Sequence, residues 1–326
     1  MTLAHQFSYD TYEDAVADYF DLGFTDGMPI VPPTPESVGE MLARAGLPAG
    51  EVLGEVPTRN VNVTAEKAAV NAVMAGCLPD YFPVVVAAVR AHLLPKGNSH
   101  STTATLGGAA HAVIVNGPAV RELGIHSGQA CFGPGFRANA TIGRALRLVI
   151  RNVCNSVPGV LDRATFSWPL RYSFCFGENE EASEWTPLHV QRGFDVTDSV
   201  VTVHSVMDFV QAIDFDPGPE AILTTIAVTG RQRGLARDEW CGDDRGLVVV
   251  IGSEHRQRFT HDGWSKERIQ EYLWPRLTAE TTSKYDMRVS LAAPENILVV
   301  AAGGPGIPVS WLLLPHLSNP MSERVQ

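Results

Sequence analysis

Apolar residues recur at helical spacing in several parts of the chain, and most of these stretches begin with a capping residue. Thr34-Pro35-Glu36 starts one such helix, because Thr can cap it, Pro suits its first turn and Glu lies near the positive end of the helix dipole. The same kind of pattern predicts further helices over residues 10–22, 64–77, 80–94, 138–153, 219–236 and 265–277.

Short apolar runs that end in turn residues alternate with these helices. They predict buried strands over residues 111–115, 200–204, 247–251 and 297–302. Strands that alternate with helices indicate an α/β fold, with mixed sheets flanked by helices and two lobes. We place the boundary near residue 195, with an N-terminal α/β domain over 1–195 that carries the polar-loop site and a C-terminal α/β domain over 196–326.

Composition narrows the class of protein. Of the 326 residues, 45% are hydrophobic and 19% are charged, which is enough to bury a sizeable core. The net charge of −11 argues against binding to nucleic acid or to an anionic membrane. The longest apolar runs are too short to cross a bilayer, the first residues lack a signal-peptide pattern, and the five cysteines are scattered. We therefore expect a cytoplasmic protein.

The strongest local motif is a glycine-rich loop that leads directly into the helix predicted to start near residue 138. Arg137, Asn139 and Thr141 fall at the beginning of that helix. Free backbone N–H groups and the dipole at a helix start favour an anion, and an arginine adds a bidentate donor. We predict that these three residues bind an anionic substrate. The alternative is a simple turn whose arginine pairs with one of the protein's own carboxylates.

A second polar segment follows at residues 177–192, between aromatic residues that can exclude water. Its Glu178, Glu181 and His189 have the side chains that acid–base catalysis requires. The alternative is a solvated acidic loop, and for Glu180 and Glu184 we prefer that interpretation.

Other polar positions have both a functional and a structural interpretation. His100 is a catalytic candidate because it lies in a polar segment where it is free to titrate, although a loop histidine is often merely exposed. Asp26 either caps its turn or enters a substrate site, and Arg192 is a further substrate-binding candidate. Gly303 and Gly304 follow a strand, where α/β proteins often bind ligands, but they also suit a tight connection.

Cys77 is the one cysteine that we include among the catalytic candidates. It ends a predicted helix, where the dipole disfavours a thiolate, so a buried apolar role is the simpler interpretation. The chain contains no HExxH motif and no histidine pair at helical i, i+4 spacing. The metal ligands and the cofactor are therefore unknown. A divalent metal is possible, but the spacing of the residues does not indicate one.

Several segments together resemble a bacterial family whose members are often encoded beside short proteins that bear a UGSC motif, where U is selenocysteine or is replaced by cysteine. These segments are TDGMPIVPPT (25–34), NAVMAGCLPDYFPVV (71–85), IVNGPAVRELGIHSG (114–128), GPGFRANATIGRALRL (133–148), FCFGENEEASEWTPLHVQRGF (174–194), DGWSK (262–266) and VVAAGGPG (299–306). The resemblance implies thiol- or selenol-dependent work on carbon–heteroatom bonds, with the partner protein supplying sulfur or selenium.

The chain departs from the pattern of that family at two places. It has Thr105-Leu-Gly-Gly108 where relatives tend to have Thr-Thr-His-Pro, and Ile307-Pro-Val-Ser310 where they tend to have Lys-His-Ser. These departures imply that this chain acts on a different substrate from its relatives, or by a different reaction mechanism.

We therefore expect an enzyme of lyase or hydrolase type that acts on a small anionic organic substrate, with Glu/His acid–base chemistry and an arginine beside a helix N-terminus holding the anion. One alternative is a subunit of a thiol- or selenol-dependent redox or C–X bond-cleaving system, which needs a UGSC-motif partner protein. The other is a non-catalytic protein that binds a small acid. In each case we expect a homo-oligomer.

Overall fold

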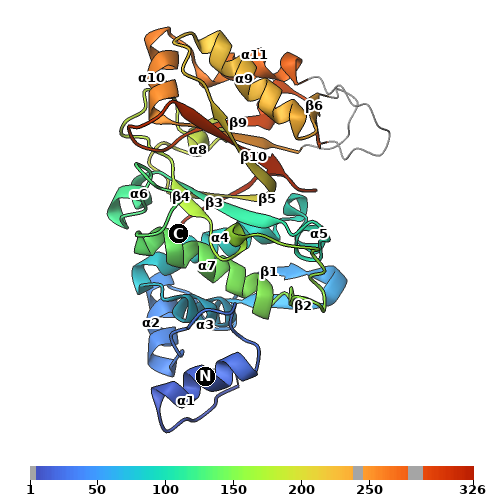
Figure 1. Cartoon of the computed structure of the whole chain (residues 1–326). Helices are drawn as coiled ribbons and strands as arrows, with labels where there is room; N and C mark the ends of the chain where they lie inside the picture. The colour runs from blue at the N-terminus through green and yellow to red at the C-terminus, as the bar shows by residue number, and fades with distance from the viewer. Residues whose placement is uncertain (1–4, 238–244, 278–288) are drawn as a thin grey trace.

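A seven-stranded mixed sheet runs through the centre of the computed structural model, which describes residues 5–237, 245–277 and 289–326 (Figure 1). The strands follow the order β4-β3-β5-β10-β7-β9, and β11 also pairs with β5. Their bounds are β3 (Ala110–Asn116), β4 (Cys175–Gly177), β5 (Val200–Ile213), β7 (Leu247–Ile251), β9 (Ile297–Ala301), β10 (Val309–Pro315) and β11 (Met321–Arg324). The pairs β3/β4 and β7/β9 are parallel and the other pairs are antiparallel, so the predicted α/β fold with mixed sheets is confirmed.

Helices cover the sheet on two sides (Figure 1). One side carries α3 (Ala65–Ala75), α4 (Phe82–Leu93) and α7 (Arg137–Asn152), with α1 (Tyr12–Asp21) and α2 (Pro35–Ala45) beyond them. The other side carries α9 (Pro219–Gln232), α10 (Ser253–His261) and α11 (Lys266–Leu273). Short helices lie in the connections: α5 (Ser99–Thr103), α6 (Pro118–Glu122) and α8 (Leu188–Gln191). Two small sheets complete the fold, β1 (Val52–Val56) with β2 (Val61–Thr64) and β6 (Leu235–Arg237) with β8 (Val289–Leu291).

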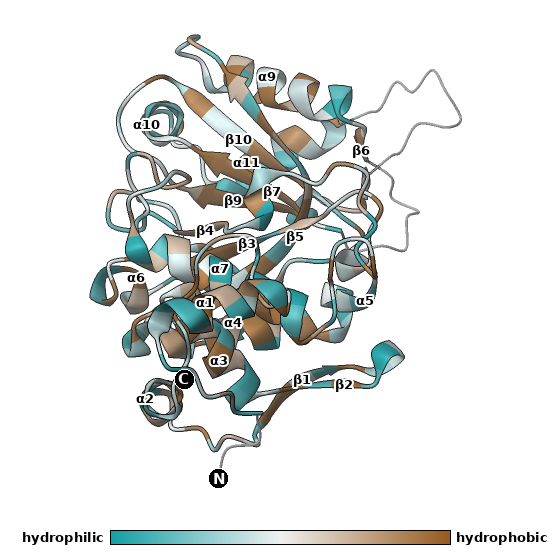
Figure 2. Cartoon of the chain, turned by 60° about the horizontal axis from the view of Figure 1, so that its bottom comes forward, coloured by the Kyte–Doolittle hydropathy of each residue, from teal (hydrophilic) through white to brown (hydrophobic). Residues whose placement is uncertain are grey.

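Alternation along the strands divides the buried side chains into three cores. In β7, Val249 packs with the α9–α11 helices, whereas its neighbours Val248 and Val250 face an inner core. In β3, Val113 packs against the α3, α4 and α7 helices, whereas Ile114 faces the same inner core. Successive side chains of a strand point to opposite faces, so a curled sheet covered on both sides produces this division. Figure 2 shows the resulting hydrophobic colour along β9.

Strand β5 connects the two halves of the chain. Its first residues pair with β3, and the remainder pairs with β10, so strands from both sides of residue 195 share one sheet. The division into domains 1–195 and 196–326 stays a prediction.

Within the part of the chain that the structure describes, no helix is both long enough and apolar enough to cross a bilayer.

Candidate functional site

The two edge strands of the central sheet, β4 and β9, approach each other at their carboxyl ends. The Asn179 amide, just after β4, donates to the carbonyl oxygen of Ala301 at the end of β9 at 2.7 Å. The Gly303 amide donates to the Ser127 carbonyl oxygen in the loop after α6 at 2.8 Å. Loops that follow β3, β4 and β9 therefore meet at one place, and loops beyond strand carboxyl ends are where α/β proteins commonly bind ligands.

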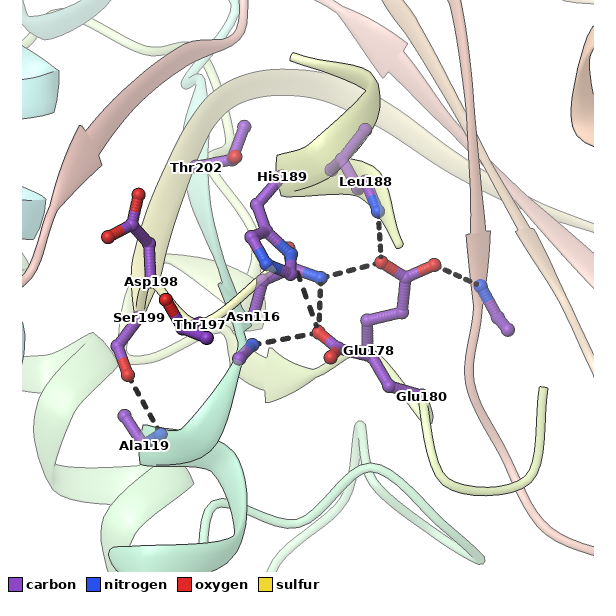
Figure 3. A network of polar contacts seen from close by, with 12 residues as sticks. Asn116, Ala119, Glu178, Glu180, Leu188, His189, Thr197, Asp198, Ser199 and Thr202 are labelled. Atoms are coloured by element: carbon purple, nitrogen blue, oxygen red, sulfur yellow. Dashed lines mark hydrogen bonds and ion pairs between the residues drawn. The ribbon is translucent and has the colours of Figure 1, made fainter. Parts of the chain in front are cut away.

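Glu178 lies at the centre of this junction (Figure 3). It is buried, and so is Lys266. The Glu178 Oε2 accepts hydrogen bonds from Asn116 Nδ2 at 2.6 Å and the Leu188 amide at 2.7 Å. Its Oε1 accepts from Lys266 Nζ at 2.7 Å and the Ala301 amide at 3.3 Å. With four donors on its two oxygens, this carboxylate joins β3, α8, α11 and β9, and we assign it a positioning role.

Glu180 has a different environment, two residues further along (Figure 3). Its Oε1 accepts from Asn116 Nδ2 and from the Gly117 amide, both at 2.8 Å, and lies 3.7 Å from His189 Nδ1. Among the described residues, nothing donates to its second oxygen. The His189 ring is fully buried and neither of its nitrogens has a hydrogen-bond partner. The Glu180 carboxylate is thus fixed through one oxygen and open through the other.

A cleft of about 440 Å³ opens beside these carboxylates. Most residues of the segment 117–127 line it, together with residues 178–181 and Val196. The exposed Arg121 side chain of α6 lines it and makes no hydrogen bond or ion pair to the described part of the protein. His126 also lines it, with its ring stacked on Phe136 at 3.7 Å and its Nε2 at 2.7 Å from the Gln129 carbonyl oxygen. Because a carbonyl only accepts, Nε2 carries the proton and Nδ1 of the neutral ring is an acceptor.

Of the catalytic residues predicted from the sequence, the structure brings together Glu178, Glu181 and His189. Glu181 is exposed and lines the cleft. His100 is elsewhere: it lies on α5, well away from α8, and its Nδ1 is 2.8 Å from Thr58 Oγ1 (Figure 1). The sequence interpretation assigned Glu180 to a solvated acidic loop, whereas the structure places it in the wall of the cleft. Its position two residues after Glu178 was a signal that both carboxylates belong to one site.

The side chains at the start of α7 are engaged by the protein itself. The exposed Arg137 guanidinium donates twice to the carbonyl oxygen of Gly76, at 3.2 and 3.0 Å, where α3 ends. Thr141 Oγ1 donates to the Arg137 carbonyl oxygen at 2.8 Å. Asn139 accepts from the His126 amide at 2.8 Å and donates to the His126 carbonyl oxygen at 2.9 Å, which holds the glycine-rich loop in place. These contacts favour the structural alternative for all three residues.

The other predicted substrate-binding residues also make internal contacts. Asp26 forms a bidentate pair with Arg144, at 2.8 and 2.7 Å. Arg192 is largely buried and donates to Ser322 Oγ and to the Pro320 carbonyl oxygen, at 2.5 and 2.8 Å.

Gly303 and Gly304 form a close contact between two loops. Gly303 has φ +83°, which favours glycine, and a Cβ on Gly304 would lie 2.7 Å from the Gln129 amide nitrogen. The pair therefore allows close loop packing, which is the alternative that the sequence left open.

The described cysteines are buried and unpaired, and burial raises their thiol pKa values. Burial raises the pKa of Cys77 to about 12, and those of Cys131 and Cys154 to about 11. The pKa of the fully buried Cys175 is raised well above its usual range. Cys241 lies outside the described residues. A thiolate role for Cys77 is thus disfavoured at neutral pH.

Within residues 5–237, 245–277 and 289–326, no three His, Cys, Asp or Glu side chains are grouped so that they could hold a metal ion. No protein-family model matches the chain, and neither a curated protein nor a solved structure matches it.

Proposed function

We propose that the cleft at the β4–β9 junction is the active site of an enzyme that moves a proton on a small anionic organic substrate, in a reaction of lyase or hydrolase type. The observation that carries the proposal is the asymmetry of Glu180, whose Oε1 is held by Asn116 and Gly117 while the other oxygen has no donor among the described residues. A carboxylate held in this way can accept a proton from a substrate without having to reorient.

The remaining groups have supporting roles in this proposal. Arg121 is the cation at the cleft and is free to pair with the substrate's anionic group, the role that the sequence analysis gave to Arg137. His189 packs behind Glu180 and positions it. The cleft volume of about 440 Å³ falls in the range of small-molecule sites.

Turnover of a panel of small acids tests the proposal. The panel holds hydroxy-, amino- and thio-substituted carboxylic acids, whose eliminations report a lyase. It also holds their O-acyl and N-acyl derivatives, which keep the free carboxylate and whose cleavage reports a hydrolase. Products are followed by NMR. For any acid that is converted, Glu180→Gln should lower kcat by about 100-fold or more, because a general base contributes roughly 10² to 10⁴ in rate. Arg121→Gln should mainly raise KM.

Glu184→Gln is the matched control, because Glu184 is an exposed carboxylate of the same segment. It should leave turnover unchanged. Wild-type kcat in Glu180→Gln, or an equal loss in the Glu184 variant, would contradict the proposal.

A further inference from the structure

A second and larger pocket, of about 580 Å³, lies along the second half of α7. We call it the arginine pocket. It is lined by Thr25, Asp26, Gly27, Arg147, Arg151, Ser156, Pro158, Asp162, Phe166, Ser167, Trp168, Pro169, Arg171 and Tyr172. It shares no lining residue with the cleft. On α7, Arg147 and Arg151 are four residues apart and so lie on one face of the helix.

Cations outnumber carboxylates in and around this pocket. The two carboxylates in its lining already have partners: Asp26 is paired with Arg144, and Asp162 with Arg171 at 2.5 Å. Neither Arg147 nor Arg151 is hydrogen-bonded to a carboxylate of the described residues, and both donate to neutral acceptors. The pocket is therefore positive within a chain whose net charge is −11.

Arg147 is the most unusual of these cations because it is buried, with 7% of its surface exposed. Its Nε donates to the Arg171 carbonyl oxygen at 3.1 Å, and its Nη1 lies 2.9 Å from His111 Nδ1. Burial and the nearby Arg171 lower the pKa of Arg147 to about 9. Asp162 opposes this shift, but its carboxylate is already paired with Arg171. A buried charge that shares its carboxylate with a second arginine is unfavourable, and an anionic ligand would relieve that cost.

Unused donors remain near Arg147. The side chain of Arg171 is 8% exposed, and its Nε is buried without a hydrogen-bond partner. No described residue accepts from Nη2 of Arg147 or from Nη1 of Arg151. Guanidinium groups with free N–H edges match the two oxygens of a carboxylate.

Aromatic side chains form another wall of the pocket. Phe166 is 94% exposed, and Tyr172 is 47% exposed. Trp168 is held in place by a 2.8 Å hydrogen bond from its Nε1 to the Gly108 carbonyl oxygen. Exposed aromatic surface beside a pocket gains free energy when a flat apolar group covers it.

We infer that the arginine pocket binds an aromatic carboxylate, with the carboxylate on Arg147 and Arg171 and the ring against Phe166 and Trp168. This is a second binding site, and the inference does not depend on the proposed function of the cleft.

Binding of 4-iodobenzoate to the full chain tests the inference, with the neutral 4-iodobenzamide as the matched ligand. Calorimetry should show iodobenzoate binding at least about tenfold more tightly than iodobenzamide, because only the carboxylate forms charged hydrogen bonds. The anomalous signal of iodine in a soaked crystal should lie beside Phe166 and Trp168. Arg147→Met should weaken binding by about tenfold or more, whereas Arg44→Met, which changes an exposed arginine elsewhere, should not.

Three outcomes would overturn the inference: equal binding of the two iodo compounds, an iodine position outside the pocket, or tighter binding of inorganic phosphate than of iodobenzoate. The iodine position needs no variant, so the test holds even if Arg147→Met fails to fold. It is also unaffected by the result for Glu180→Gln in the cleft.

Discussion

The cleft and the arginine pocket each have a buried charged group beside them, but the two groups have opposite surroundings. Glu178, beside the cleft, has four donors, and one of them is the buried cation Lys266. Arg147, in the arginine pocket, has a carbonyl oxygen and a histidine nitrogen as its acceptors and no carboxylate among the described residues. Burial alone therefore does not mark a ligand site. A buried charge with all its partners supports the fold, whereas one whose nearby carboxylate, Asp162, is already paired with another arginine indicates where a ligand belongs.

The largest expected change in stability follows from a substitution beside the cleft. Lys266→Met removes the counter-ion of Glu178 and leaves a buried carboxylate without its cation, so it should lower the free energy of unfolding by about 3–5 kcal/mol. Urea denaturation measures the change, with Lys67→Met as the control because Lys67 is exposed. A loss below about 1 kcal/mol would mean that the junction tolerates an unpaired carboxylate.

The cationic surroundings of the arginine pocket should also make stability depend on pH. Burial, Arg147 and Arg59 lower the pKa of His92 to about 3. The unfolded chain therefore takes up this proton first, near pH 6.5, and stability falls as the pH drops below that value. For His92 alone the loss between pH 7 and pH 5 should be about 2 kcal/mol.

His92→Asn should remove that part of the slope of unfolding free energy against pH. His261→Asn should not, because the side chain of His261 is 87% exposed. An unchanged slope in the His92 variant would mean that folding does not lower the pKa of this ring.

Arg147→Met should affect stability less than Lys266→Met does, and this contrast tests the comparison directly. The variant loses two hydrogen bonds, worth about 1 kcal/mol each, but it also removes an unfavourable buried charge, so we expect a net change of about 1 kcal/mol or less. Urea denaturation without added ligand measures it. A loss as large as that of Lys266→Met would show that Arg147 supports the fold as Glu178 does.

The smallest expected change in stability follows from a substitution at the start of α7. Arg137→Ala removes two hydrogen bonds from an exposed side chain to the Gly76 carbonyl oxygen, and it should lower stability by less than about 1 kcal/mol. It should leave both turnover in the cleft and iodobenzoate binding unchanged. Loss of either would restore the interpretation of Arg137 as a substrate-binding residue.

The sequence by itself determined most of the local structure. Thr34, Thr64 and Ser265 are helix N-caps as their patterns indicated, because a cap bonds to an amide only three residues away. The strand over 247–251 has the predicted bounds. Local patterns did not predict strands whose extent depends on pairing with other strands. The predicted strand 200–204 extends to Ile213 as β5, and β10 and β11 were not predicted.

Only the tertiary structure decided which polar residues meet. Glu178 and Lys266 are 88 residues apart, and the curled sheet brings them together where β4 and β9 approach each other. The sequence predicted the helix α7 and an anion-binding arginine on it. It indicated Arg137, because the residues that begin a helix can be recognised from sequence alone. Arg137 donates to the Gly76 carbonyl oxygen at the end of α3. Arg147 is buried against residues 162–172 and is not hydrogen-bonded to a carboxylate among the described residues. Such contacts between distant segments leave no local pattern.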